Sequence, residues 1–230
     1  MTTHPLIPHN KPERPNSSSR VHLDPQLELL RQWQMARLNQ TYTDLLASPD
    51  SRDACRFFLC DVYGPRDFNQ REQEILQVYQ SMKKYLPVRI MHTIELAIRL
   101  DDLTFDLDDA LLRVLVNELS VTDTITPELY AEAYRRCHNN DKRAEQIDLV
   151  VEVGQKINQL IHIPFIGLTL RMAHQPAHWM GWSELQDFLE RGYVAFRNLS
   201  NAKAFLRIIE QRERQISDQL FAGVSNPFVI

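Results

Sequence analysis

Apolar residues recur every three to four positions from Asp24 almost to the end of the chain, a spacing typical of amphipathic helices. The first such stretch follows Asp24-Pro25, an N-cap residue with proline at the first helical position, and runs to about Ser48. Few runs alternate with a period of two, and none is flanked by a hairpin turn pair such as Asn-Gly. The pattern predicts an all-α fold, a single globular bundle of about nine or ten helices with short connections.

Proline, glycine and capping residues mark where these helices begin and end. We expect a second helix to start at Pro49-Asp50 and to end at Tyr63-Gly64-Pro65, where glycine can adopt the left-handed conformation and proline cannot continue a helix. The acidic stretch from Asp101 to Asp109 is expected to form a turn, and Pro176 is expected to break a short helix that begins near Pro164. Further helices are expected to start at Asp67, Pro87, Thr126-Pro127, Asn139, Ser183 and Ala202, the last of them ending at Gly223.

Residues 1–22 lack this periodicity. They contain Pro5, Pro8, Pro12 and Pro15, followed by a run of serines, a composition typical of a flexible tail rather than of packed structure. We therefore expect a disordered Pro/Ser-rich tail over residues 1–22 and one all-helical domain over residues 23–230.

The overall composition is that of an ordinary globular protein. Hydrophobic residues make up 43% of the 230 residues, too many for a disordered chain. The 26 lysines and arginines are outnumbered by 30 aspartates and glutamates, and this slight acidity argues against nucleic-acid binding. No apolar run approaches the roughly 18 residues of a membrane span, and no secretory signal is recognisable. The three cysteines show no disulfide or zinc spacing, which is typical of reduced thiols in the cytoplasm. We therefore expect a cytoplasmic protein that contacts neither membranes nor nucleic acid.

A charged and aromatic group of residues surrounds the Gly64-Pro65 break. Asp61, Tyr63, Arg66 and Asp67 could line a ligand pocket at the junction of two helices, and they are the candidate ligand-binding residues. A structural role, which is commoner at such turns, explains the same residues: Asp67 caps the next helix, Tyr63 packs, and Arg66 forms an ion pair with Asp61.

The acidic stretch suggests magnesium chemistry. Asp101, Asp102 and Asp106 have a spacing that can hold magnesium for diphosphate chemistry at the end of a helix. A second metal-binding element is missing, however, and aspartates are favoured at helix ends for structural reasons. The interpretation as a helix end and a turn is therefore preferred.

Histidines and glycines give no stronger sign of a cofactor. His174 and His178 are four residues apart, which would place them on one face of an unbroken helix, but Pro176 lies between them. His92 lies near an apolar face and could bind a haem, although a lone histidine there is more often a core residue. No glycine-rich phosphate loop and no Gly-x-Ser-x-Gly motif occurs. We therefore expect neither a metal nor a cofactor.

Two longer stretches are similar to a known group of proteins. The first is FFLCDVYGPRDF at Phe57–Phe68, and the second joins PAHWMG at Pro176–Gly181 to LQDFLERG at Leu185–Gly192. They resemble a family of uncharacterised all-helical bacterial proteins with an FFL-x-D-x-YGP-x-DF stretch, and the similarity runs from about Ala54 to Phe221. The resemblance implies a helical domain of unknown function, and it supplies neither an activity nor catalytic residues.

With no catalytic constellation, we expect a non-enzymatic cytoplasmic protein that acts through protein–protein contacts, self-association included. The turn Trp179-Met180-Gly181-Trp182 would be a binding hot spot if it is exposed. The charged residues between Arg207 and Arg214 of the last helix are expected to form a solvated face, and a surface that binds a partner helix is the second interpretation. The alternative is a protein that binds a small molecule or cofactor, and that could be an enzyme, with an inter-helix pocket near the Asp61–Asp67 turn.

Overall fold

The computed structural model of the chain describes residues 25–62, 88–179 and 183–229. These residues form nine α-helices and two π-helical segments and contain no strand, which confirms the all-α prediction. Their order along the chain is α1 (Pro25–Thr41), α2 (Thr43–Ala47), α3 (Arg52–Phe57), η2 (Phe58–Val62), α5 (Val88–Arg113), η3 (Val114–Glu118), α6 (Pro127–Arg136), α7 (Asn140–Ile161), α8 (Ile166–Trp179), α9 (Ser183–Arg197) and α10 (Ala202–Ala222). The expected tail and the expected helix after Asp67 lie outside the described residues.

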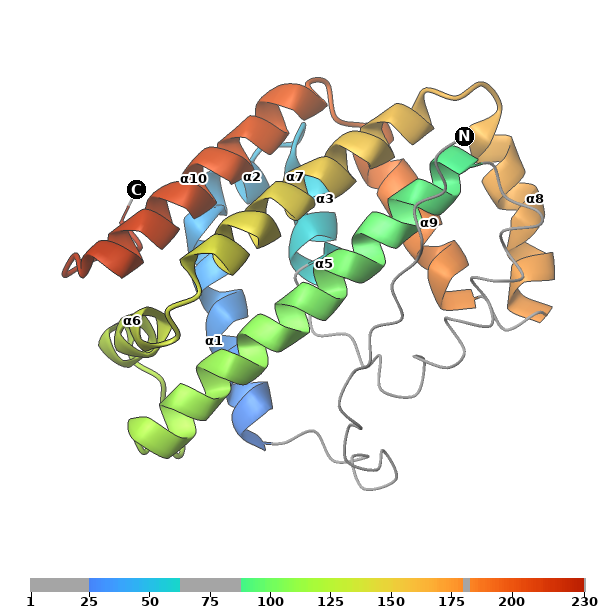
Figure 1. Ribbon diagram of the computed structural model, residues 1–230. Helices are drawn as coiled ribbons and strands as arrows, with labels where there is room; N and C mark the ends of the chain where they lie inside the picture. The colour runs from blue at the N-terminus through green and yellow to red at the C-terminus, as the bar shows by residue number, and fades with distance from the viewer. Residues whose placement is uncertain (1–24, 63–87, 180–182, 230) are drawn as a thin grey trace, which may run out of the picture.

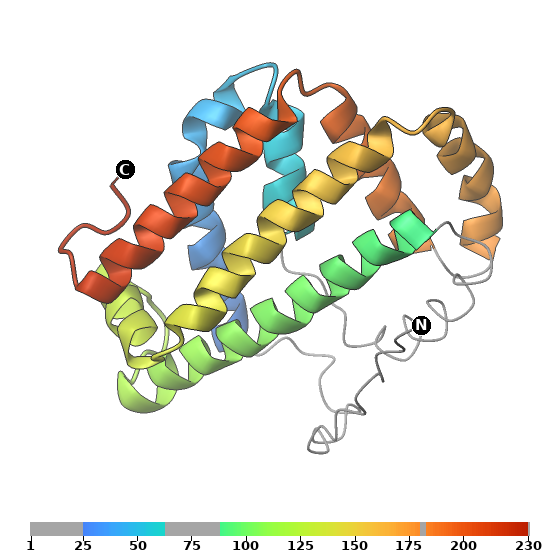
Figure 2. The same ribbon diagram turned by 45° about the horizontal axis from the view of Figure 1, so that its top comes forward.

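Three long helices form the front layer of the molecule in the view of Figure 1. α5, α7 and α10 lie side by side with α7 in the middle, and neighbouring helices run antiparallel (Figure 1, Figure 2). α1, α3 and α9 lie behind this layer, while α6 closes one end of the molecule and α8 the other. The buried apolar faces of the two layers meet between them and form the core.

A glycine lets α7 approach α10 closely. A Cβ atom on Gly154 would lie 2.4 Å from Cδ2 of Leu206 on α10 and 3.0 Å from Cζ of Phe58. Carbon atoms that are not bonded to each other normally stay about 3.5–4.0 Å apart. A side chain at residue 154 would therefore force the buried side chains of Leu206 and Phe58 to shift.

Two large clusters of buried side chains hold the layers together. In the larger cluster, aromatic rings from α3, η2, α9 and α10 pack on one another, and the ring centroids of Phe58 and Phe205 lie 5.5 Å apart. The second cluster surrounds α6, where the ring of Trp33 on α1 stacks on Tyr130 with 4.1 Å between centroids. Full burial of one such side chain stabilises the fold by about 1.5–3 kcal/mol, so these clusters supply much of the stability.

Three helix boundaries lie where local sequence signals predicted them. α1 begins at Pro25. At the start of α6, Oγ1 of Thr126 accepts a hydrogen bond of 3.3 Å from the N–H of Leu129, and Pro127 occupies the first turn. α10 ends at Gly223, whose φ of 71° is left-handed. Caps of this kind act through the nearest residues alone, which is why the sequence predicted them.

The turn expected between Asp101 and Asp109 does not form, and that prediction was wrong. α5 passes through the whole acidic stretch as one helix. Leu100, Leu107 and Leu111 keep helical spacing across it and are all buried. Packing of this apolar stripe offsets the weak helix propensity of aspartate. Neither α5 nor any other described helix is long and apolar enough to cross a membrane.

The first two expected helices also differ from the prediction. The stretch expected to run to Ser48 is interrupted at Tyr42, where φ is −111° and ψ is 22°, between α1 and α2. α3 continues into the π-helical segment η2, in which each hydrogen-bonded turn encloses one more residue than in an α-helix. This wider turn buries Phe58 and Leu59 and still lets Asp61 reach α9.

Candidate metal centre

α8 and α9 form an antiparallel pair of helices at one end of the molecule (Figure 1). The prediction that Pro176 breaks the first of them is wrong, because α8 is helical from Ile166 to Trp179. Proline lacks an N–H and so removes one backbone hydrogen bond from α8, and packing against α9 keeps the helix intact. The two helices approach so closely that a Cβ atom on Gly167 would lie 2.4 Å from the hydroxyl oxygen of Tyr193.

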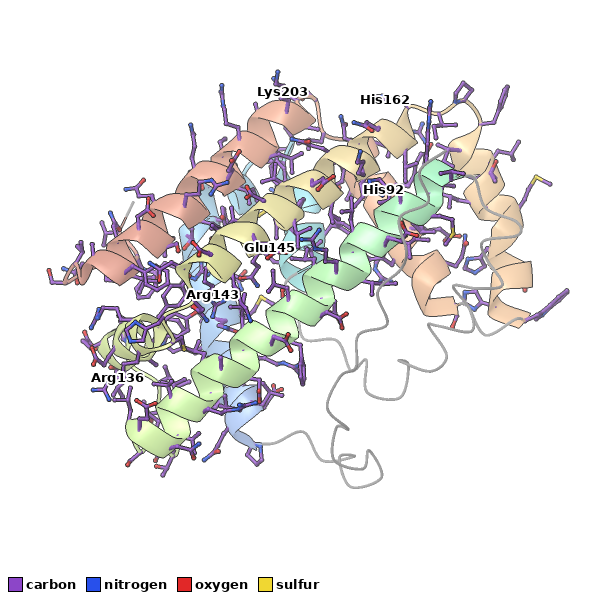
Figure 3. All side chains as sticks on the ribbon, viewed as in Figure 1. His92, Arg136, Arg143, Glu145, His162 and Lys203 are labelled. Atoms are coloured by element: carbon purple, nitrogen blue, oxygen red, sulfur yellow. The ribbon has the colours of Figure 1, made fainter. Side chains whose placement is uncertain are left out.

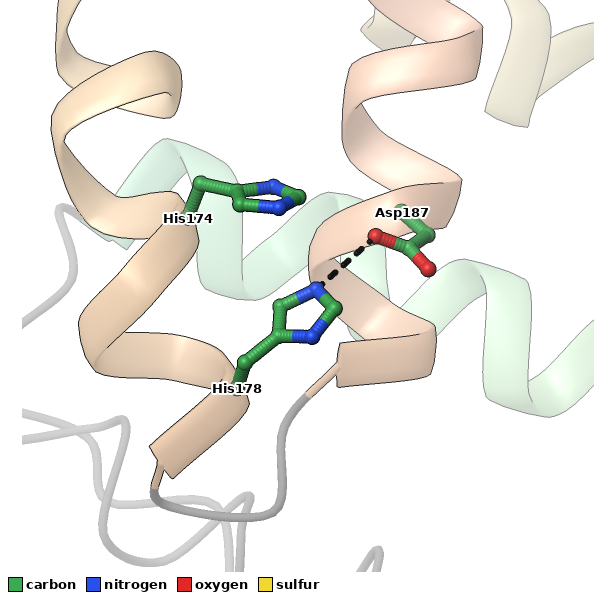
Figure 4. A group of neighbouring side chains, drawn as sticks. All are labelled: His174, His178 and Asp187. Atoms are coloured by element: carbon green, nitrogen blue, oxygen red, sulfur yellow. Dashed lines mark hydrogen bonds and ion pairs between the residues drawn. The ribbon is translucent and has the colours of Figure 1, made fainter.

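The unbroken helix places two histidines on the face that is turned to α9. His174 and His178 are four residues apart, and their ring centroids lie 4.3 Å apart with 36° between the ring planes. Figure 4 shows both rings projecting from α8 toward α9. Residues that are four apart lie on one face of a regular helix, and His174 and His178 do so here although Pro176 lies between them.

Two carboxylates of α9 meet these rings. Nε2 of His178 lies 3.2 Å from Oδ1 of Asp187, the contact drawn in Figure 4. Nδ1 of His174 lies 3.0 Å from Oε1 of Glu190. Asp187 and Glu190 are three residues apart on α9 and therefore share the face toward α8. The helix pair brings two imidazoles and two carboxylates together.

Gln186 fixes the position of Glu190. Its Nε2 donates one hydrogen bond of 2.7 Å to Oε1 of Glu190 and another of 2.7 Å to the carbonyl oxygen of Leu170 on α8. Gln186 is buried, whereas the side chains of His178 and Asp187 are each 36% exposed. The inner side of the cluster is held by hydrogen bonds, and the outer side is open to solvent.

The geometry is close to that of a metal-binding site. One nitrogen of each histidine and one oxygen of Asp187 lie within 4.8 Å of one another. In tetrahedral zinc sites with bonds of about 2.0–2.1 Å, ligand atoms are about 3.4 Å apart. Because Nδ1 of His174 faces Glu190, its Nε2 is left for a metal ion. A carboxylate on the second ring nitrogen is the usual arrangement around a metal-bound histidine.

Two imidazoles and one carboxylate are a known ligand set for several transition metals. The set binds zinc when water takes the fourth position, and it binds iron(II) when further positions stay open. The side chains present thus suit a divalent transition metal better than magnesium or calcium, which take oxygen ligands.

The magnesium hypothesis for the acidic stretch is wrong. Asp101, Asp102 and Asp106 are all exposed on α5. In the part of the chain that the structure describes, they do not form a group with metal-ligand spacing. Carboxylates spread over the solvent side of a helix cannot converge on one ion.

The ligand pocket predicted around residues 61–67 is described only at its first residue. Asp61 forms an ion pair with Arg191 of α9, with 2.8 Å between Oδ1 and Nη2. Tyr63, Arg66 and Asp67 lie outside the described residues, so the pocket and the expected pair of Arg66 with Asp61 stay predictions. The observed pair fixes η2 to the helix that also carries the two carboxylates of the candidate metal centre.

The interpretation of His92 as a core residue or a haem ligand was also wrong. The side chain of His92 is 48% exposed, and its Nδ1 lies 3.8 Å from Oε2 of Glu95. His92 is therefore neither a core residue nor enclosed enough to bind a haem. The i, i+4 pair of histidines, followed by two carboxylates on the next helix, is the sequence signal for this candidate centre. Sequence reasoning missed it because it gave Pro176 too much weight.

Comparison with known proteins agrees with the helical resemblance. A family model described as a domain of unknown function, DUF8198, matches residues 13–227. The chain belongs to this family. No curated protein matches it significantly, and no solved structure does. Family membership therefore supports a helical domain without giving an activity, and function has to be argued from the residues themselves.

Proposed function

We propose that this protein binds a divalent transition-metal ion through His174, His178 and Asp187. The observation that carries the proposal is the convergence of their ligand atoms within 4.8 Å, with the second nitrogen of His174 held by Glu190. Zinc is the first candidate, because two imidazoles and one carboxylate bind it with water in the fourth position.

The ion would join α8 to α9, since its ligands come from both helices. α8 packs mainly on α9 and makes few contacts with the other described helices. A ligand that binds only the folded form stabilises that form, so the ion would hold this end of the molecule together. The open coordination position would face solvent beside the exposed His178.

Titration of the full-length, chelator-treated protein with cobalt(II) tests this proposal, because tetrahedral cobalt(II) absorbs visible light. We expect one ion per chain, displaced by zinc, in the wild type and in His162→Ala, which changes an exposed histidine outside the site. Binding by His178→Ala should be at least roughly tenfold weaker. Equal binding by wild type and His178→Ala contradicts the proposal.

A second candidate function is self-association, and an exposed apolar row on and just before α8 favours it. The row consists of Phe165, Leu168, Met172 and Trp179, which are 79%, 54%, 70% and 83% exposed. Successive members are three, four and seven residues apart, the spacing of a coiled-coil seam. Trp179 is the described part of the aromatic turn that the sequence marked as a possible hot spot.

We propose that a second copy of this chain covers the row. Arg171 is the one side chain of α8 with a permanent charge, so two copies of the helix can meet with little repulsion. A seam of one short helix buries less than the roughly 800 Å² per partner of a standard interface. We therefore expect a weak dimer that forms at micromolar concentrations.

Sedimentation equilibrium over a range of protein concentrations tests the dimer. Met172→Glu should be monomeric, because it places a charge in the middle of the row. Val88→Glu is the control, since Val88 is 84% exposed and lies outside the row, and it should dimerise like the wild type. A wild type that stays monomeric at about 100 μM rules the proposal out.

We also propose a cytoplasmic location, supported by the state of the cysteines. Cys55, Cys60 and Cys137 are all free thiols. Burial raises the pKa of Cys55 to about 12, which keeps this thiol protonated and unreactive. Fractionation of host cells tests the location, and recovery outside the cytoplasmic fraction contradicts it.

A further inference from the structure

A small polar cavity is lined by residues of α1, α5, α6, α7 and α10. One of these helices, α6, closes the end of the molecule opposite α8 (Figure 1). Its volume is about 60 Å³, roughly the space that two water molecules take up. The polar side chains that matter for its chemistry are Arg31, Arg37, Asp108, Tyr130, Arg143 and Glu213.

Positive charge exceeds negative charge around this cavity. Three arginines and two carboxylates line it, and one pair cancels, because Nη1 of Arg37 lies 2.7 Å from Oε1 of Glu213. Burial on its own would lower the pKa of Arg37, but the charge and hydrogen bond of Glu213 raise it overall. The same carboxylate oxygen also accepts a hydrogen bond of 2.8 Å from the hydroxyl of Tyr42. The charge of Glu213 is thus paired with Arg37 and does not balance the other two arginines.

Arg143 is buried, and its hydrogen-bond partners are neutral groups. It belongs to the first turn of α7 (Figure 3) and is 6% exposed. Its guanidinium lies 4.7 Å from the ring centroid of Tyr134, and Nη1 donates a hydrogen bond of 3.1 Å to Oε1 of Gln146. Nη2 lies 3.5 Å from the carbonyl oxygen of Leu107, and Nε has no acceptor. The carboxylate of Asp108 interacts with both Arg143 and Arg31, so these two arginines share a single counter-charge, and buried charges are unfavourable unless they are balanced.

Other donors around the cavity also lack acceptors. Nε of Arg37 has no partner, and within the described part of the chain neither the half-buried Arg31 nor the hydroxyl of the buried Tyr130 has a hydrogen bond. The remaining carboxylate, Asp108, already accepts a hydrogen bond of 2.9 Å from Nε2 of Gln34. Burial raises the pKa of Asp108, and the charges of Arg143 and Arg31 oppose this rise. Among these charged and hydroxyl groups, donors outnumber acceptors around one small cavity.

We propose that this cavity binds a small oxyanion, a carboxylate or a phosphate, beside the guanidinium of Arg143. Oxygen atoms of such an anion would accept hydrogen bonds from Arg143 and from the hydroxyl of Tyr130, and its charge would balance the one positive charge that Glu213 and Asp108 leave over. The volume has room for a group of a few heavy atoms. The site is independent of the candidate metal centre, with which it shares no residue.

Thermal unfolding of the full chain in matched salts tests this inference. Sodium acetate and sodium phosphate are compared with sodium chloride at equal ionic strength and pH, with a chelator present. We expect one oxyanion to raise the unfolding temperature in a saturable way, in the wild type and in Arg99→Met, which changes an exposed arginine on α5. The apparent affinity of Arg143→Met should be at least roughly tenfold weaker. The anion that acts distinguishes a carboxylate ligand from a phosphate ligand.

Tyr130→Phe provides a second variant in case Arg143→Met does not fold. It keeps the aromatic ring that stacks on Trp33 and removes one donor from the cavity, so anion affinity should fall severalfold. Equal responses of the wild type to oxyanions and to chloride overturn the proposal. An oxyanion response that is undiminished in both variants does the same, and Arg143 and Asp108 would then form an internal pair bridged by water.

Discussion

Arg37 on α1 and Glu213 on α10 form a buried ion pair, with 2.7 Å between Nη1 and Oε1, although 176 positions separate them in the sequence. Their side chains are only 13% and 9% exposed. The hydroxyl of Tyr42 donates to the same oxygen. Because a charge left behind in a protein interior is strongly unfavourable, this contact ties the first and last described helices together.

Glu213→Gln should lower the free energy of unfolding by about 3–5 kcal/mol, because it leaves the buried guanidinium of Arg37 without a counter-charge. Urea denaturation followed by circular dichroism measures the change. Tyr42→Phe is the matched control, since it removes one neutral donor from the same carboxylate and should cost about 1 kcal/mol. Similar losses in the two variants would show that the ion pair contributes little.

Asp108 should make stability fall as the pH rises. Burial raises its pKa above the ordinary value of 3.8, so the folded form holds this proton more tightly than the unfolded chain. The free energy of unfolding therefore decreases from about pH 4 upward, until the pH has passed the raised pKa. Asp108→Asn keeps an acceptor for Gln34 and removes this decrease. The advantage of the variant over the wild type in urea denaturation should grow between pH 4 and neutral pH, and a constant difference contradicts the assignment.

Asp44 should show the opposite dependence on pH. Nη1 and Nη2 of Arg212 donate hydrogen bonds of 2.7 and 2.6 Å to its two oxygens, and they lower the pKa of this carboxyl. Its ionised form stabilises the fold above about pH 4, and the contribution is lost as the pH falls through the lowered pKa. Asp44→Asn should reduce stability at neutral pH by less than about 1 kcal/mol, because the pair is partly exposed. Raising the salt concentration should reduce the difference in stability between the wild type and Asp44→Asn. A difference that persists at pH 2 would show that it does not come from the ionised carboxylate.

Gly154→Ala should lower the free energy of unfolding by about 1–3 kcal/mol, because its methyl group would overlap Leu206 at the crossing of α7 and α10. Gly223→Ala is an informative comparison, since a Cβ there would lie 4.0 Å from Nη1 of Arg135, an ordinary contact, and the expected cost of about 1 kcal/mol comes from the left-handed φ of 71°. Urea denaturation measures both. An unchanged midpoint for Gly154→Ala would mean that the two helices can separate without loss.

Glu190→Gln should weaken metal binding about tenfold without changing the one-to-one stoichiometry, because Glu190 orients His174 and does not bind the ion itself. The cobalt(II) titration measures the affinity. Glu118→Gln, which changes a half-exposed glutamate of η3 far from α8, should bind like the wild type. Complete loss of binding in Glu190→Gln would make Glu190 a direct ligand instead.

Helix ends were predictable where one or two neighbouring residues decide them. Thr126 caps α6 and Gly223 ends α10, as expected from their own chemistry. Whether a helix continues through an unfavourable residue depends on distant partners, so the sequence wrongly predicted breaks at Asp101–Asp109 and at Pro176. In both places an apolar or closely packed face of the helix offsets the local preference.

The two candidate sites show the same limit. The spacing of His174 and His178 was visible in the sequence, but their use as ligands depends on α9, which supplies Asp187. Glu213 was expected on a solvated face because it stands among other charges, and the structure buries it against Arg37. The periodicity of the sequence near Glu213 cannot indicate a contact with a residue that lies 176 positions away.

The π-helical turn from Phe58 to Val62 makes the packing of this stretch depend on the number of residues that it contains. It contains one residue more than the α-helical turn that it replaces. Deleting a single residue would restore a regular α-helical turn and change the directions of the side chains within this stretch by up to about 100°. Phe58 and Asp61 could then no longer face Phe205 and Arg191 together. Among relatives of this protein, we therefore expect this stretch to vary in residue type far more readily than in length.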